Sequence, residues 1–194
     1  MNEDIQIRLD DLIKRLQTAY DGIGHNSGRP YVYFVYPSKQ ESTLQRMMRE
    51  QLRNNTHLFF HCLDLLPLTI QCLEGQEERR QELLDKPRTQ KSTVDSIVAL
   101  WKERIYAVII DALSEAQIDK RPVVVLYGLA ALHPLTNPSV LMEYIADKPP
   151  RNPHNGTIIP IVVFIPGSRP PLGSRQYYFL DLEPQLDFYR GEEI

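Results

Sequence analysis

The chain has 194 residues, of which 42% are hydrophobic and 24% charged, and this composition excludes a wholly disordered protein. Lys and Arg number 22 against 25 Asp and Glu, so the net charge of -3 argues against a protein that works mainly by gripping nucleic acid with a basic surface. The first residues are charged, and the longest apolar run, residues 158–165, is too short to span a bilayer. We therefore expect a cytoplasmic protein in which Cys62 and Cys72 are reduced thiols.

Hydrophobic spacing predicts an amphipathic helix over residues 1–20 and then a glycine-containing loop over 21–30. After this loop, runs that are apolar on both faces predict strands, and periodic runs predict helices between them. In chain order, the further predictions are strand 31–36, helix 42–53, strand 56–63, helix 65–73 capped by Asp64, a solvated helix and loop over 76–90, helix 94–117, strand 121–128, helix 139–146, strand 157–167, edge strand 176–182 and a polar tail over 183–194.

Strands that are apolar on both faces and alternate with helices are typical of a mostly parallel sheet covered on both sides. We therefore predict a single domain over 1–194 with a doubly wound, Rossmann-like α/β fold of four to five strands. In such sheets ligands bind beyond the carboxyl ends of the strands. The positions to test for function are therefore 37–42, 63–64, 128–136 and 166–175.

A nucleotide or single-stranded nucleic-acid site is one hypothesis for these strand ends. The glycine-containing run in 21–30 precedes the first strand, so it lacks the strand-loop-helix context of a phosphate-binding loop. The loop after that strand contains Lys39 and Ser42 but no glycine, and the third strand ends at Gly128, where a magnesium-dependent nucleotidase would need Asp or Glu. Lys39, Ser42 and Gly128 therefore stay as candidate ligand contacts, without a prediction of hydrolysis.

Patterns for metal binding and nucleophilic catalysis are incomplete. His57 and His61 are ligands that zinc accepts, and Cys62 is adjacent, but no second ligand pair stands elsewhere in the sequence. A buried or strand-end histidine is the simpler interpretation. The chain has no GxSxG elbow, and Cys62 and Cys72 are more typical of small buried hydrophobic residues than of nucleophiles. We therefore expect no metal site, no cofactor and no catalytic cysteine.

A divergent metal-dependent nuclease is a further alternative. Asp181 and Glu183 flank one residue of the predicted edge strand 176–182, as paired carboxylates of a nuclease do, but a proline follows where a lysine would help. A charged edge strand that resists pairing with other sheets is the stronger explanation of these two residues. We therefore expect no enzymatic activity.

The loop and strand that follow the last long apolar strand concentrate arginine and tyrosine. These residue types dominate protein interfaces, and they also stack on and neutralise single-stranded nucleic acid. An ordered proline-rich loop that packs its own aromatic side chains explains the same composition. The candidate partner-binding residues are Gly167, Arg169, Arg175, Tyr177 and Tyr178.

The later predicted strands end in a recognisable pattern of glycine and proline residues. An apolar strand ends in Gly128, a loop with Pro134 and Leu135 leads into a helix, and a second apolar strand ends in the Phe-x-Pro-Gly of residues 164–167. This pattern resembles the BrxB family of the bacteriophage-exclusion (BREX) defence systems. The earlier strand-helix units resemble the family as well, so the resemblance covers residues 3–182.

The resemblance implies a small cytoplasmic subunit of a multi-protein complex that restricts phage and marks host DNA. It implies a degenerate nucleoside-triphosphatase-type α/β domain without catalytic residues. It also implies a partner-binding role, with PglZ, a protein of the alkaline-phosphatase superfamily, as the expected partner. On this basis we expect a non-enzymatic adaptor that binds a PglZ-like protein and other BREX components, and that contacts neither nucleic acid nor membrane directly.

Overall fold

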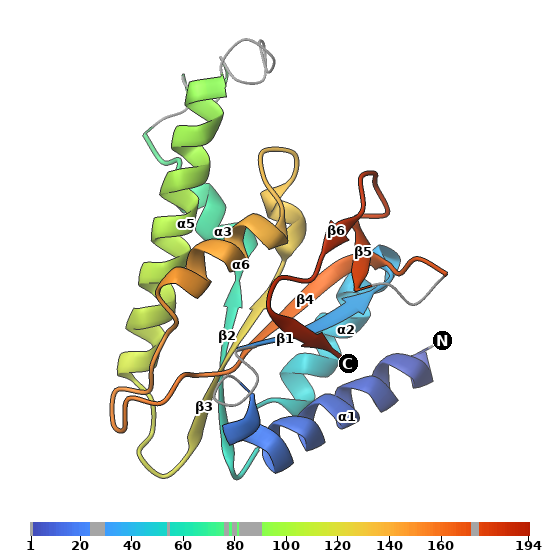
Figure 1. Ribbon diagram of the computed structural model, residues 1–194, viewed down its shortest axis with the longest axis vertical. Helices are drawn as coiled ribbons and strands as arrows, with labels where there is room; N and C mark the ends of the chain where they lie inside the picture. Colours follow the sequence, from blue (N-terminus) through green and yellow to red (C-terminus); the bar gives the residue numbers. More distant parts are fainter. Residues whose placement is uncertain are drawn as a thin grey trace.

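The computed structural model of the chain describes residues 2–23, 30–53, 55–75, 78, 81, 91–171 and 175–194. Within these residues, five parallel strands form the main sheet. Their order is β2 (Leu58–Asp64), β3 (Arg121–Tyr127), β4 (Ile161–Ser168), β1 (Tyr31–Tyr36) and β7 (Gly191–Glu193) (Figure 1). The predicted α/β fold with a mostly parallel sheet is confirmed.

Helices cover both faces of this sheet. α1 (Asn2–Ala19) and α2 (Glu41–Gln51) pack on one face, while α3 (Leu65–Gln71), α5 (Lys91–Ser114) and α6 (Pro138–Asp147) pack on the other (Figure 1). Three short 3-10 turns complete the described helices, namely η1 (Tyr20–Gly22), η2 (Ser38–Gln40) and η3 (Leu129–Leu132).

β1 shows why runs that are apolar at every position predict strands in this chain. Successive side chains of a strand point to opposite faces. Tyr31, Tyr33 and Val35 therefore enter the core under α5 and α6, and the three residues that alternate with them enter the core under α1 and α2. Because both faces are covered, all six positions of this strand are buried.

Side-chain caps begin two of the helices. Asp64 Oδ1 accepts a hydrogen bond from the Leu66 N–H at 3.0 Å and starts α3, which confirms the predicted cap. Asn137 accepts from the Val140 N–H at 3.2 Å and starts α6, with Pro138 in the first helical position, where its missing N–H breaks no bond. The solvated helix and loop predicted over 76–90 fall outside the described residues, apart from positions 78 and 81.

Residues 183–194 do not form the polar tail that the sequence predicts. β5 (Gln176–Phe179) pairs antiparallel with the end of β4 and with β6 (Leu186–Asp187), and β7 then runs parallel to β1. Phe188 is buried between Tyr177 and Tyr33, with ring centroids 5.0 and 4.9 Å away. Gly191 permits the close approach of β7, because a Cβ there would stand 2.0 Å from a carbon of the Tyr33 ring.

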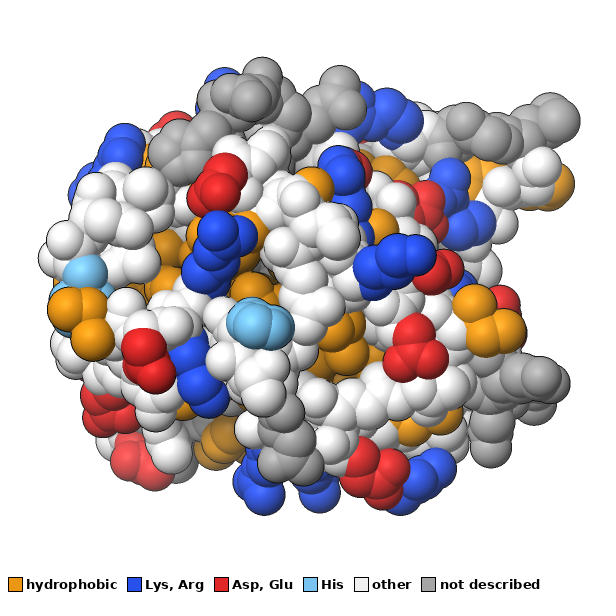
Figure 2. Space-filling view, turned by 90° about the horizontal axis from the view of Figure 1, so that it is seen from below, with side chains coloured by type: hydrophobic (Ala, Val, Ile, Leu, Met, Phe, Trp, Pro, Cys, Tyr) orange, Lys and Arg blue, Asp and Glu red, His pale blue; other side chains and the backbone are white. Residues whose placement is uncertain are grey.

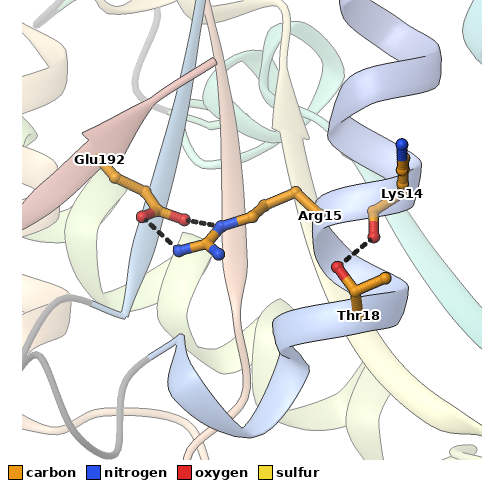
Figure 3. Close-up of polar contacts among 4 residues, drawn as sticks. All are labelled: Lys14, Arg15, Thr18 and Glu192. Carbon is orange, nitrogen blue, oxygen red and sulfur yellow. Dashed lines mark hydrogen bonds and ion pairs between the residues drawn. The ribbon is translucent and has the colours of Figure 1, made fainter.

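Arg8 and Arg15 of α1 hold β7 against the sheet. Arg15 makes a two-pronged ion pair with Glu192, in which Nε and Nη2 each lie 2.9 Å from a carboxylate oxygen (Figure 3). Arg8 donates to the carbonyl oxygens of Val35 at 2.8 Å and Ile194 at 2.6 Å. These contacts join the first helix to the last strand across 177 and 186 residues of chain.

The face at the amino ends of the parallel strands has a mixed chemistry (Figure 2). Basic and acidic side chains are interspersed on it, with hydrophobic side chains in groups between them. Among the described residues visible in this view, no field of a single charge sign gathers of the kind that binds nucleic acid. In open α/β sheets ligands bind at the opposite edge, beyond the carboxyl ends of the strands.

Candidate functional site

β1 and β4 are neighbours at the point where an open α/β sheet most often binds its ligand. The chain leaves β1 toward α2 on one face of the sheet, but leaves β2 and β3 toward α3 and α6 on the other. In this protein β5 and its turn cover that point. The Leu180 N–H donates to the Pro166 carbonyl oxygen at 2.8 Å, and the Ser38 hydroxyl donates to Asp181 Oδ2 at 3.3 Å. The chain's own contacts thus occupy the usual ligand position.

The predicted strand-end ligand residues do not form one cradle. Lys39 and Ser42 are exposed after β1, whereas Gly128 follows β3, and β4 lies between these strands, which separates them by about 10 Å. Gly128 has φ 69, and a Cβ there would stand 2.3 Å from Asp64 Oδ1. The left-handed φ and the close approach of the Asp64 cap explain why glycine occupies position 128.

Two of the predicted partner-binding residues lie in the interior, and the prediction that they form a surface patch is wrong for them. Tyr177 is 0% exposed; its ring stacks on Phe188, and its hydroxyl lies 3.0 Å from Ser139 Oγ. Gly167 is buried opposite Phe179 in the pairing of β4 with β5. The alternation of β5 turns Tyr177 toward the core, and β5 itself covers Gly167.

The other predicted partner-binding residues contact the chain's own C-terminal segment. These contacts join Arg169 to Glu193, Arg175 to the Gly191 carbonyl oxygen at 2.7 Å, and Tyr178 to Gln185. The Arg169 guanidinium also lies over the Phe188 ring, 5.3 Å from its centroid. Internal packing of arginine and aromatic side chains, the interpretation that the sequence left open, therefore accounts for much of this cluster.

Asp181 and Glu183 do not lie on a strand, which corrects the prediction of an edge strand over 176–182. β5 ends at Phe179, because Leu180 and Asp181 have φ values of 56 and 61 that turn the chain out of the extended conformation. Asp181 accepts the Ser38 hydroxyl, as described above. In the part of the chain that the structure describes, no group of three or more His, Cys, Asp or Glu side chains is arranged to hold a metal ion.

The two histidines considered for zinc are in different environments. His57 precedes β2 and is exposed, whereas His61 lies within β2 and is 8% exposed. His61 Nε2 finds no hydrogen-bond partner among the described residues, and the Phe59 ring packs edge-on at 4.7 Å between centroids. Burial lowers the pKa of His61, and the nearby Glu115 carboxylate opposes this only in part. His61 is a neutral core histidine at neutral pH.

We expect the stability of the protein to fall between about pH 7 and about pH 5, in part through His61. Because its pKa is lower in the folded than in the unfolded state, the unfolded chain takes up the proton first, and acid favours unfolding. The His61→Leu variant should lose less stability over this range than the wild type. Urea unfolding at both pH values measures this. The prediction is contradicted if the free energy of unfolding changes by the same amount between the two pH values in the wild type and in His61→Leu.

A groove between α2 and β2 contains residues that sequence reasoning missed. Its volume is about 320 Å³. Met48, Leu52, Phe60 and Tyr127 line it with apolar surface, and the exposed side chains Arg49 and Arg53 supply positive charge. Arg49 lies in the last turn of α2, and Arg53 lies two residues beyond the end of the helix. The sequence could not predict that β2 and β3 pass beside these arginines, because this depends on the path of the chain through the sheet.

Cys62 opens into the same groove. Although the side chain is exposed at the groove mouth, the atoms around the thiol displace water and raise its pKa to about 11, against a smaller opposing effect of Arg53. The thiol is therefore protonated at neutral pH and is a poor nucleophile there. It adds weakly polar surface to the groove.

Comparison with known proteins adds no assignment. The chain matches no family model, no curated protein and no solved structure. Of the described helices, none combines the length and the hydrophobicity needed to cross a bilayer. The resemblance to the BrxB family stays a prediction. Of the residues that carry it, Gly128 follows β3, Pro134 and Leu135 follow η3, and Phe164, Pro166 and Gly167 lie in β4.

Proposed function

We propose that this chain is a non-enzymatic adaptor of a BREX-type anti-phage complex and that it binds a PglZ-like protein of the alkaline-phosphatase superfamily. The observation that carries the proposal is the groove between α2 and β2, where two exposed arginines flank apolar side chains beside an edge strand. Arginine next to aromatic and aliphatic surface is the chemistry of protein interfaces. The resemblance to BrxB supplies the identity of the complex and of the partner.

The strand ends agree better with a binding protein than with the alternatives kept from the sequence. The turn after β5 covers the switch point, Gly128 is explained by the Asp64 cap, and Arg169 is paired with Glu193. Lys39 and Ser42 alone provide no cradle for a phosphate. These contacts favour a role in which the sheet is a rigid support and recognition occurs on its surface.

The test is capture of the tagged chain from its native host at moderate salt, followed by mass spectrometry and size-exclusion chromatography. We expect stoichiometric recovery of a PglZ-like protein that co-elutes with the chain. A species of 22.5 kDa that elutes alone under these conditions would contradict the adaptor function. Thermal stabilisation of the isolated chain by ATP, GTP or a single-stranded oligonucleotide would favour the ligand-binding alternative instead, because a ligand that binds the folded state raises its stability.

A further inference from the structure

The outer edge of β2 is open in the described chain, where β2 pairs only with β3. The Arg121 N–H donates to the His57 carbonyl oxygen at 3.0 Å, so the His57 carbonyl points toward β3. Along a strand, the backbone N–H and C=O groups of successive residues point to opposite sides. The backbone groups of Phe60 and Cys62 therefore point away from β3, toward the open edge. The open edge thus offers donors and acceptors to a further strand.

The residues that face this open edge also supply side chains to the groove. Leu58 packs in the core under α1 and α2, and Phe60 and Cys62, two and four positions on, line the groove between α2 and β2. A strand added at this edge would send every second side chain to the same face, over the groove. Backbone pairing and side-chain recognition can therefore be made by one extended segment.

The charge of the groove indicates what this segment carries. Neither Arg49 nor Arg53 forms an ion pair with a carboxylate of the described residues, although Arg46 on the same helix pairs with Glu50 at 3.2 Å. The Arg49 guanidinium donates to the Gln45 side-chain oxygen at 3.4 Å. In a chain of net charge -3, this is a local positive site open to solvent. Acidic side chains would complement it, and apolar ones would cover Met48 and Phe60.

We propose that the outer edge of β2 binds an extended segment of the partner protein that alternates acidic and apolar side chains, and that Arg49 and Arg53 pair with its acidic residues. This inference rests on the proposed adaptor function and names the docking surface and the chemistry of the partner. Main-chain hydrogen bonds to Phe60 and Cys62 hold the segment, and the groove selects its side chains.

The experiment repeats the capture from the native host with two charge-matched double variants. Arg49→Glu with Arg53→Glu reverses the charge of the groove, and Lys14→Glu with Lys148→Glu makes the same charge change outside it. All four side chains are exposed, so both variants should melt like the wild type. We expect the groove variant to recover about tenfold less partner than the wild type, and the control variant to recover a similar amount to the wild type.

Alkylation of Cys62 reports on the groove directly. In a Cys72→Ser background, Cys62 is the remaining thiol of the chain, and N-ethylmaleimide should modify it several-fold more slowly in the captured complex than in the free chain. Full recovery of partner by the groove variant, or an unchanged alkylation rate, would overturn the proposed docking surface and leave the adaptor function standing.

If the wild type captures no partner, the adaptor function fails, and synthetic peptides decide the docking surface on its own. The probes are a peptide that alternates valine and glutamate and one that alternates valine and lysine. Preference for the glutamate peptide, lost in Arg49→Glu with Arg53→Glu, supports the docking surface. Equal binding of both peptides, or binding of neither, overturns it.

Discussion

The Gly167→Ala variant should lower the free energy of unfolding by about 3 kcal/mol or more, a large loss for a chain of this size. Gly167 has φ 152, and a Cβ there would stand 1.9 Å from the Tyr178 carbonyl oxygen and 3.2 Å from the Leu180 nitrogen. Both are backbone atoms, which cannot move aside by rotating a side chain. β5 would have to separate from β4, with loss of the Leu180 to Pro166 hydrogen bond.

Equilibrium denaturation of Gly167→Ala measures this effect, and Gly22→Ala is the matched control. No heavy atom lies within 4 Å of a Cβ placed at Gly22, so this control should change the free energy of unfolding by about 0.5 kcal/mol or less. If Gly167→Ala is as stable as Gly22→Ala, the tight contact between β4 and β5 is not as described.

The Tyr177→Ala variant should lose about 3 to 5 kcal/mol of stability, as large aromatic truncations in a core do. Tyr177 is fully buried, and its ring stacks on Phe188 at 5.0 Å with 24° between the ring planes. Tyr177→Phe should cost about 1 kcal/mol, because it removes only the contact with Ser139. The Ser139 hydroxyl keeps its bond to the Asp187 carbonyl oxygen, at 2.9 Å.

Tyr178→Ala separates this core role from an interface role. Tyr178 is the next residue of β5, points to the other side and is only half-buried. Its truncation should cost about 1 kcal/mol. Denaturation curves of the three variants test the prediction. A Tyr177→Ala protein that is as stable as the wild type but loses partner capture would restore the surface role that the sequence suggested.

The variants at Gly167 and Tyr177 bear on why residues predicted to form an interface contact the chain itself. Arginine, tyrosine and proline around 168–179 have the composition of an interface, but composition does not say which surface they meet. In this protein the partner is the chain's own C-terminal segment, since Arg169 and Arg175 contact residues of β7. The groove beside Arg49 and Arg53 was missed for the reverse reason, because its residues come from separate elements and form no compact motif.

The sequence alone determined the fold class and the order of most elements. Strands that are apolar at every position, such as 31–36, are stable only where both faces of the sheet are covered. The local residue pattern therefore predicts a sheet with helices on both faces. The Asp64 cap is equally local, because a carboxylate and the N–H that it accepts are two residues apart. Where the physical cause lies within a few residues, the sequence was sufficient.

Only the tertiary structure decided how distant segments meet. Residues 183–194 are too polar to predict β7; the segment joins the sheet because Arg8 and Arg15 of the first helix and the Tyr33 ring complement it. The edge position of β2, and with it the groove beside α2, likewise follows from strand order. Such pairings depend on two complementary partners far apart in the chain, so neither partner's local pattern can reveal them.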